Sequence, residues 1–237
     1  MRRTLAVLAV AGLLTMAGCL GGGAVDEQAL AEPANYEWNT SADVSVSVDG
    51  GSYQAVLAMN DRTNVSLFGP GEFGGETALP IRAVKYRYPN GTVVNASALS
   101  VSEVGERTVV EVPRSGGQLA YTAGVLSNEL FLPVTINGSY AVRLPPGTAV
   151  SAPIIGGARP GGYDLERTED RITLRWQNPE TDVLSVDYYQ ERNLYIFGGL
   201  LGVAGLIAGA GLLYFRAQLR TLAARRGAVG PDDIDDP

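Results

Sequence analysis

The chain of 237 residues carries 25 acidic and 18 basic side chains, contains no histidine, and is 46% hydrophobic. The acidic balance argues against nucleic acid as a partner, because phosphates demand a basic surface. Without histidine there are no Ser-His-Asp or Cys-His nucleophiles and no histidine-ligated metals, so we expect no catalytic residues, no metal and no cofactor. Excess carboxylate beside a single lysine, Lys85, indicates a salt-adapted surface. A GC-rich genome is the alternative, although it would explain the arginines and not the acidity.

Residues 1–18 have the pattern of an export signal, in which two arginines precede an apolar run over residues 5–16. The sequence Leu-Thr-Met-Ala-Gly-Cys at residues 14–19 resembles a lipobox, which predicts lipidation of Cys19, although Met16 departs from the usual leucine. The paired arginines also resemble a weak twin-arginine signal. Two alternatives stay open: an uncleaved spanning helix over residues 5–25, and a free mature N-terminus.

We expect residues 19–35 to form a flexible tether and residues 36–193 to form an extracellular β domain. Segments that alternate apolar and polar residues recur between Gly, Pro and Asn, with no helical period of useful length between them, which predicts an all-β sandwich. The segments begin near residues 43, 52, 83, 107, 139, 172 and 183.

The middle of this domain has a weaker strand signal, in "GQLAYTAGVLSNELFLP". One long sandwich and two in tandem are therefore both open, with a boundary near residues 113–117 if there are two. Asn90-Gly91 and Asn137-Gly138 each stand between alternating segments, and Asn-Gly favours a two-residue hairpin turn.

Residues 194–215 form an uncharged stretch whose length as a helix, about 33 Å, matches the hydrocarbon core of a bilayer. Arginines follow it, so the tail at residues 216–237, basic and then acidic, is predicted to be cytoplasmic and the β domain to lie outside the cell membrane. Four glycines share one helix face and predict close approach of a second transmembrane helix, either self or other; they are Gly198, Gly202, Gly205 and Gly209.

Five Asn-x-Ser/Thr sequons lie in the segment expected outside the cell, where chance predicts about one. They make the protein a candidate glycoprotein. The candidate sites are Asn39, Asn64, Asn90, Asn95 and Asn137.

Other reactive side chains have simpler structural interpretations. Lys85 lies on the polar face of its alternating segment, so we expect a solvated lysine. Trp38 and Trp176 are expected in the core and not at a ligand platform. Four carboxylates are expected in a charged loop before the strand near residue 172; they are Asp164, Glu166, Glu169 and Asp170.

The segment at residues 144–189, "LPPGTAVSAPIIGGARPGGYDLERTEDRITLRWQNPETDVLSVDYY", resembles the immunoglobulin-like β modules found just outside terminal transmembrane helices in many archaeal surface proteins. Together with the lipobox, it resembles an uncharacterised family of haloarchaeal surface lipoproteins. The resemblance covers most of the chain and implies a fold but no active residues.

The favoured function is a non-enzymatic, membrane-anchored module that binds or spaces at the cell surface, with membrane lipid as its partner. The alternative is an accessory subunit of a transport or signalling complex that docks through the glycine face of its helix. An enzyme that uses carboxylates alone is the least favoured hypothesis, because every histidine-based chemistry is absent.

Overall fold

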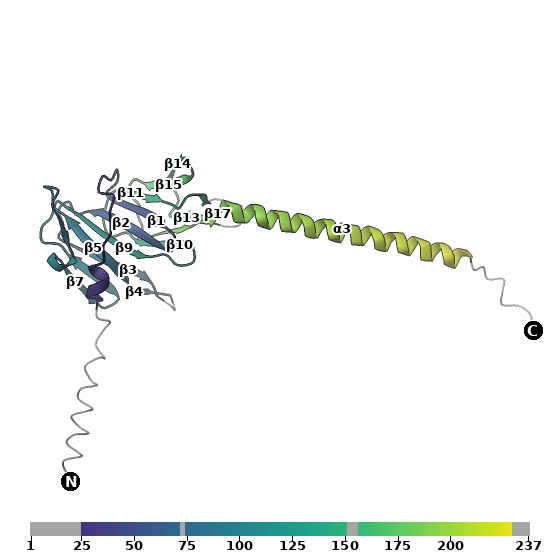
Figure 1. Ribbon diagram of the computed structural model, residues 1–237, viewed down its shortest axis with the longest axis horizontal. Coiled ribbons are helices and arrows are strands. Elements are labelled where there is room, and N and C mark those ends of the chain that lie inside the picture. Colours follow the sequence, from purple (N-terminus) through teal and green to yellow (C-terminus); the bar gives the residue numbers. More distant parts are fainter. Residues whose placement is uncertain (1–24, 72–73, 151–155, 229–237) are drawn as a thin grey trace, which may run out of the picture. The chain divides into compact units, whose positions relative to one another are not determined.

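A computed structural model describes residues 25–71, 74–150 and 156–228 (Figure 1). The chain divides into two compact units, a β-rich unit that ends at Tyr189 and a helical unit that begins at Gln190. The expectation of a β domain followed by one C-terminal apolar helix is therefore confirmed.

The largest sheet has eight strands in the order β14-β15-β11-β1-β2-β9-β5-β6. Its neighbours pair antiparallel except β1 and β11, which run parallel. The strands are β1 (Val44–Asp49), β2 (Ser52–Ala58), β5 (Ile81–Arg87), β6 (Val93–Asn95), β9 (Gln118–Gly124), β11 (Tyr140–Arg143), β14 (Asp164–Thr168) and β15 (Arg171–Trp176).

Smaller sheets and short helices complete the β-rich unit. A four-stranded sheet has the order β4-β3-β8-β7, a three-stranded sheet has the order β10-β16-β13, and β12 pairs with β17. These elements are β3 (Asn64–Pro70), β4 (Glu76–Ala78), β7 (Ser100–Val104), β8 (Arg107–Glu111), β10 (Glu129–Pro133), β12 (Thr148–Ala149), β13 (Gly157–Arg159), β16 (Val183–Asp187), β17 (Tyr189–Gln190), α2 (Glu27–Leu30) and the 3-10 helix η2 (Ala96–Ala98).

One hydrophobic core joins the sheets. Buried side chains from the eight-stranded, four-stranded and three-stranded sheets form a single cluster, exemplified by Val46, Leu67 and Leu132. Tyr140, at the start of β11, donates its hydroxyl to the carbonyl oxygen of Ile136 (2.7 Å) and accepts from the Ile136 N–H (3.2 Å). This bond across four residues has the form of the tyrosine corner of Greek-key sandwiches. It fixes the path of the chain into the parallel β1–β11 pair.

All seven segments with clear alternation are strands, namely β1, β2, β5, β8, β11, β15 and β16. The weak middle stretch also contains two strands, β9 and β10, and β9 lies inside the largest sheet between β2 and β5. Five consecutive residues of β9 are buried, so both of its faces are covered. Because alternation marks a strand with one wet face, a strand covered on both sides loses that pattern.

The loop at residues 113–117 connects β8 to β9. The eight-stranded sheet takes strands from both sides of this loop, and the core is shared. Gly117 has no room for a side chain there, because an added Cβ would lie 2.4 Å from the carbonyl oxygen of Arg87.

The two Asn-Gly pairs behave differently. Asn90-Gly91 lies in a hairpin between β5 and β6, as expected, but the loop is longer than two residues because Arg87 pairs with Val93. The hairpin expected at Asn137-Gly138 is wrong, because the flanking strands belong to different sheets: β10 pairs with β16 and β11 pairs with β1 and β15. Gly138 has φ +145° and packs against the carboxylate of Asp43, which explains the glycine without a hairpin.

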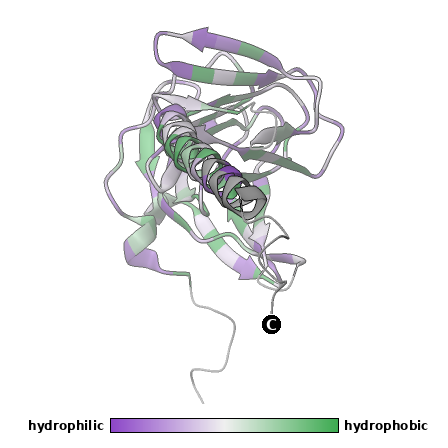
Figure 2. Ribbon diagram, turned by 90° about the vertical axis from the view of Figure 1, so that its right-hand side faces the viewer, coloured by the Kyte–Doolittle hydropathy of each residue, from purple (hydrophilic) through white to green (hydrophobic). Residues whose placement is uncertain are grey.

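The helical unit consists of α3 (Glu191–Ala228). Its stretch Glu191–Arg220 is long and apolar enough to cross a membrane, and none of its apolar window is buried in the described structure. Figure 2 shows hydrophobic colouring along much of this helix. The expected transmembrane segment, residues 194–215, lies within it.

Candidate functional site

The packed domain begins earlier along the chain than the expected boundary at residue 36. Asp26 caps α2 by accepting from the backbone N–H groups of Gln28 (3.0 Å) and Ala29 (3.2 Å). Leu30 at the end of α2 is buried in the main core. The part of the expected tether that the structure describes, from Val25 onwards, is therefore packed against the β domain.

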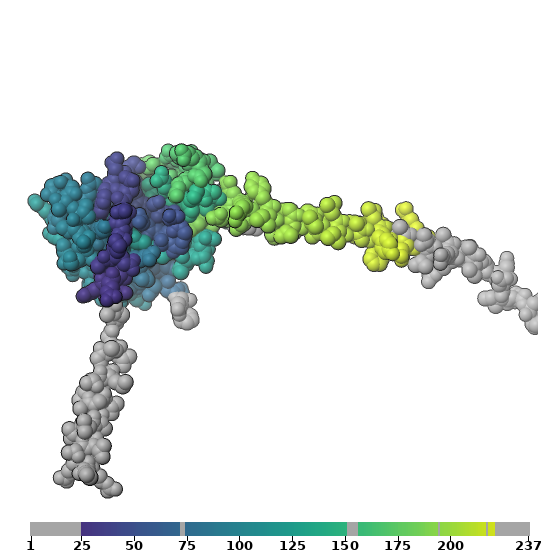
Figure 3. Space-filling view, in the orientation of Figure 1, coloured from purple at the N-terminus to yellow at the C-terminus, as the bar shows by residue number. Residues whose placement is uncertain are grey.

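Residues 32–41, here called the strap, continue across the outer face of the eight-stranded sheet, the face that points away from the core. Figure 3 shows this first described part of the chain, in dark purple, on the surface of the domain. Tyr36 is its main anchor: the ring packs on Val56 and Ala120, and the hydroxyl donates to the Ala83 carbonyl (2.7 Å). The same hydroxyl lies 2.9 Å from the hydroxyl oxygen of Thr122. Burial raises the pKa of Tyr36, so its hydroxyl remains a neutral donor.

The Ala83 carbonyl is available because β5 contains a bulge. The register of β5 on β9 shifts between Arg82 and Lys85, and Ala83 has φ +54°, an uncommon angle for a residue with a side chain. Bulges redirect backbone groups in this way. The sequence carries one sign of this bulge: the adjacent apolar residues Ala83 and Val84 place Arg82 and Lys85 three positions apart, which breaks the period of two.

Two further side chains hold the backbone of the strap. Lys85 donates through Nζ to the Ala34 carbonyl, and Gln118 donates through Nε2 to the Trp38 carbonyl (3.1 Å). Lys85 is half-buried, so the expectation of a freely solvated lysine is wrong. The strap covers the amine, and the single lysine of the chain has a structural role.

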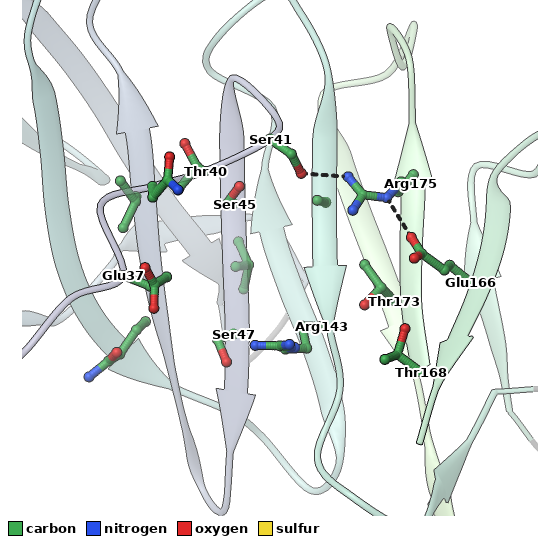
Figure 4. Close-up of a pocket in the computed structure, with 15 residues that line it drawn as sticks. Glu37, Thr40, Ser41, Ser45, Ser47, Arg143, Glu166, Thr168, Thr173 and Arg175 are labelled. Atoms are coloured by element: carbon green, nitrogen blue, oxygen red, sulfur yellow. Dashed lines mark hydrogen bonds and ion pairs between the residues drawn. The ribbon is translucent and has the colours of Figure 1, made fainter. Parts of the chain in front are cut away.

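The strap covers the sheet over β2, β9 and β5 and leaves the outer face open over β1, β11 and β15. There the structure contains a groove of about 380 Å³ (Figure 4). The strap forms one wall and the β14–β15 hairpin forms the other. The polar residues of the groove are Glu37, Asn39, Thr40, Ser41, Ser45, Ser47, Gln54, Arg143, Glu166, Thr168, Thr173 and Arg175.

Strand register explains why the floor of the groove is open. Ser45 and Ser47 of β1 pair with Ala141 and Arg143 of β11, so small side chains occupy the middle of the sheet face. Arg143 pairs on its other side with Thr173 of β15. The backbone of Arg143 therefore lies between two residues with hydroxyl groups, and Figure 4 shows its side chain extending toward Ser47.

The two arginines of the groove have different partners. Arg175 is held by Glu166 (Nε to Oε2, 3.2 Å) and by the hydroxyl of Ser41 (2.9 Å), which links the hairpin wall to the strap wall. Arg143 is exposed and, within the described residues, has no hydrogen bond or ion pair. The same holds for Glu37 on the strap wall. As far as the described residues show, the groove thus presents one unpaired cation and one unpaired anion among neutral polar side chains.

The four carboxylates expected in a charged loop are distributed otherwise. Asp164 and Glu166 belong to β14, the edge strand of the large sheet, and only Glu169 and Asp170 form the turn before β15. Glu166 is part of the groove wall. Across the described residues, no group of three or more Asp, Glu, Cys or His side chains is placed to hold a metal.

All five sequon asparagines are exposed in the structure. Asn39 lies on the strap and lines the groove, whereas Asn90 already accepts a hydrogen bond from the Thr92 N–H (3.0 Å). Asn64 begins β3, Asn95 ends β6, and Asn137 lies between β10 and β11. The asparagine side chains are therefore placed on the surface that a modifying enzyme would reach.

Of the two tryptophans expected in the core, Trp176 is buried there, whereas Trp38 is only partly buried against the small cluster beneath the strap. Trp176 is 2% exposed, donates through Nε1 to the Pro160 carbonyl (2.9 Å) and makes a tilted ring contact with Tyr163. Trp38 is half-buried and makes an edge contact with Tyr36. Neither tryptophan lines the groove.

Cys19, the predicted lipidation site, lies outside the described residues. The four glycines of the predicted packing face all lie in the continuous helix α3, and an added Cβ at each would meet no described atom within 4 Å; they are Gly198, Gly202, Gly205 and Gly209. The face that the spacing predicts is therefore open.

Within the described residues, the chain is of the class that joins a β-rich domain to one C-terminal helix long and apolar enough to span a membrane. Residues 40–234 match a family of unknown function, DUF5803, and the chain belongs to that family. The match includes both the β domain and α3. No curated protein and no solved structure matches the chain.

Proposed function

We propose that this protein is a non-enzymatic binding module of the cell surface, anchored in the cell membrane by α3 with its β domain outside and its C-terminal end in the cytoplasm. The observation that carries the proposal is α3, whose apolar stretch is unburied and is followed by arginines, because positive charge favours the cytoplasmic side. A second anchor, a lipid on Cys19, agrees with the same orientation. The salt-adapted composition is consistent with a haloarchaeal surface lipoprotein.

The immunoglobulin-like character of the β domain is part of this proposal. It is supported by the tyrosine corner at Tyr140, which pins the chain to Ile136, and by the packing of several sheets around one core. Modules of this kind commonly present a sheet face or loops to a partner, and here the open groove on the outer sheet face is the candidate binding surface.

Site-specific thiol labelling tests the orientation. Glu106→Cys places a thiol in the exposed β7–β8 turn, and Arg220→Cys places one at the end of the membrane-crossing stretch. A membrane-impermeant maleimide added to intact cells is expected to label Glu106→Cys and to label Arg220→Cys only after lysis. Wild-type protein measures the reactivity of Cys19, which a lipid would block. Labelling of Arg220→Cys on intact cells would reverse the proposed topology.

The alternative function is an accessory subunit that docks through the open glycine face of α3. The test is purification in mild detergent and high salt of a variant with all four face glycines changed to leucine. Gly199 and Gly211 lie elsewhere around the same helix, so changing both to leucine gives a matched control. A membrane partner lost only from the face variant would favour the subunit function. If no specific partner accompanies any form, that function is refuted.

A further inference from the structure

We propose that the groove on the outer face of the eight-stranded sheet binds an acidic saccharide, a sugar chain that carries carboxylate groups. The inference deepens the proposed surface-binding function and rests on it. It names the ligand class and the residue that recognises it, Arg143.

Charge is distributed unevenly over the domain. Residues 20–193 contain 12 basic side chains, and six of these lie on the outer face of one sheet. Strand pairing places them there: three on β5, one on β11 and two on β15, namely Arg82, Lys85, Arg87, Arg143, Arg171 and Arg175.

The carboxylates are distributed differently. The same segment contains 21 of them, and of those that the structure describes only five belong to this face and its strap, namely Glu32, Glu37, Asp49, Asp164 and Glu166. The outer face is therefore close to neutral on a domain that is strongly acidic elsewhere. An anionic ligand is repelled by most of the surface and is least repelled here.

The six basic side chains of this face differ in whether they have a hydrogen-bond or ion-pair partner. Arg82 faces Glu32 (3.9 Å), Lys85 donates to the strap, and Arg175 is paired with Glu166. Arg171 donates to the Leu144 carbonyl (3.3 Å). Within the described structure, the remaining two guanidinium groups, on Arg87 and Arg143, have no partner, and only Arg143 lies in the groove.

The hydrogen-bonding groups of Arg143 and of the groove around it favour a ligand that carries both carboxylates and hydroxyl groups. A guanidinium presents paired N–H donors that match the two oxygens of a carboxylate. Ser45, Ser47 and Thr173 line the same groove with hydroxyl groups, and Glu37 on the strap wall, unpaired within the described residues, is an acceptor for ligand hydroxyl groups. Donors and acceptors at this density favour a ligand that is itself covered with hydroxyl groups. An acidic peptide fits such a lining less well, because extended peptides commonly bind by pairing with an exposed strand edge and by placing side chains in pockets.

The volume of the groove is consistent with this ligand class. About 380 Å³ falls at the lower end of the range of roughly 300–1,000 Å³ found for ligand pockets. Because Arg175 bridges Ser41 and Glu166, both walls are already fixed before a ligand arrives. A preorganised site of this kind loses less entropy on binding.

The experiment is a calorimetric titration of the full chain in detergent micelles, produced in a host without N-glycosylation so that Asn39 carries no glycan at the groove. The probes are trigalacturonate, neutral maltotriose and triglutamate. Trigalacturonate is expected to bind, maltotriose at least tenfold more weakly, and triglutamate at least tenfold more weakly than trigalacturonate. Arg143→Gln is expected to weaken trigalacturonate binding about tenfold, while Arg87→Gln, the other free arginine of the same face, leaves it unchanged.

Several results would overturn the inference. Absence of binding by every probe refutes it, as does equal binding of maltotriose. Stronger binding of triglutamate would assign the groove to acidic peptides. Equal losses in Arg143→Gln and Arg87→Gln would reduce the effect to overall charge. Thermal unfolding of both variants checks that each is folded, and the thiol labelling described above, which is independent of any ligand, separates failure of this inference from failure of the membrane placement.

Discussion

Two buried tyrosines give opposite expectations for the same chemical change, removal of one hydroxyl. Tyr140 and Tyr53 are each 1% exposed. The Tyr140 hydroxyl bonds both backbone groups of Ile136, itself 2% exposed, whereas the Tyr53 hydroxyl makes no hydrogen bond of good geometry among the described residues and has only the side chain of Tyr121 as a polar neighbour. Phenylalanine keeps the ring in both cases, so each variant isolates the polar group.

The change in the free energy of unfolding depends on which groups lose a hydrogen bond when each hydroxyl is removed. Tyr140→Phe strands a buried N–H and a buried carbonyl, which costs about 2 kcal/mol in the free energy of unfolding. For a β unit that ends at Tyr189, this corresponds to a fall in melting temperature of about 6 °C. Tyr53→Phe removes a polar group that is already desolvated and unpaired, so we expect a melting temperature that is unchanged or raised.

The assay is thermal unfolding of the full chain in detergent micelles, followed by far-ultraviolet circular dichroism, which reports on the β domain as its sheets are lost. Wild type, Tyr140→Phe and Tyr53→Phe are compared at one salt concentration. Equal shifts in the two variants would refute the reasoning, since they would show that hydrogen bonding of the hydroxyl does not decide its contribution. A fall of several degrees in Tyr53→Phe alone would show that its hydroxyl has a partner.

Two further predictions concern the strap and acid stability. Tyr36→Phe removes the hydroxyl that bonds Ala83 and Thr122, so amide hydrogen exchange in residues 34–40 is expected to accelerate about 30-fold, and unchanged exchange there would contradict the anchoring role. Asp43 accepts from the Ser139 N–H and hydroxyl (both 2.8 Å), and these bonds lower the pKa of the Asp43 carboxyl. Its contribution to stability is therefore present above the unfolded pKa of about 3.9 and lost as pH falls through the lower folded value. Ser139→Ala should lower the melting temperature at pH 6 and weaken the acid dependence below pH 4, and a parallel shift at all pH values would refute the linkage.

The sequence predicted strands best where one face is wet and one is dry. β1, β2 and β15 alternate and were found, because their polar faces remain exposed or line the groove. β9 was obscured by its own burial, since the strap covers Ala120 and Thr122 on the face that solvent would otherwise reach. Alternation of apolar and polar residues reflects which faces of a strand are exposed to water. For β9 the strap, a segment distant in the sequence, covers the second face.

The groove depends on contacts that a linear pattern does not contain. Ser41 and Arg175 are far apart in sequence and meet because β1 lies beside β11. This pairing is parallel, so no hairpin turn joins the two strands and no turn sequence predicts it. Gly138 was predicted to lie in a hairpin turn, whereas it lies against Asp43. A hairpin turn and close approach of a side chain both favour glycine, so the sequence alone does not distinguish them. The charge of Glu166 is evident in the sequence, but its partner Arg175 lies across the β14–β15 hairpin.

Packing of α2 against the β domain limits how high that domain stands above the lipid. If Cys19 is the acylated residue, only residues 20–24 separate it from the first described residue, Val25, and five extended residues span roughly 17 Å. With that lipid in the membrane, this short segment would limit how far the N-terminal end of the β domain can lie from the lipid headgroups. A ligand would then have to cross the surrounding envelope to reach the domain.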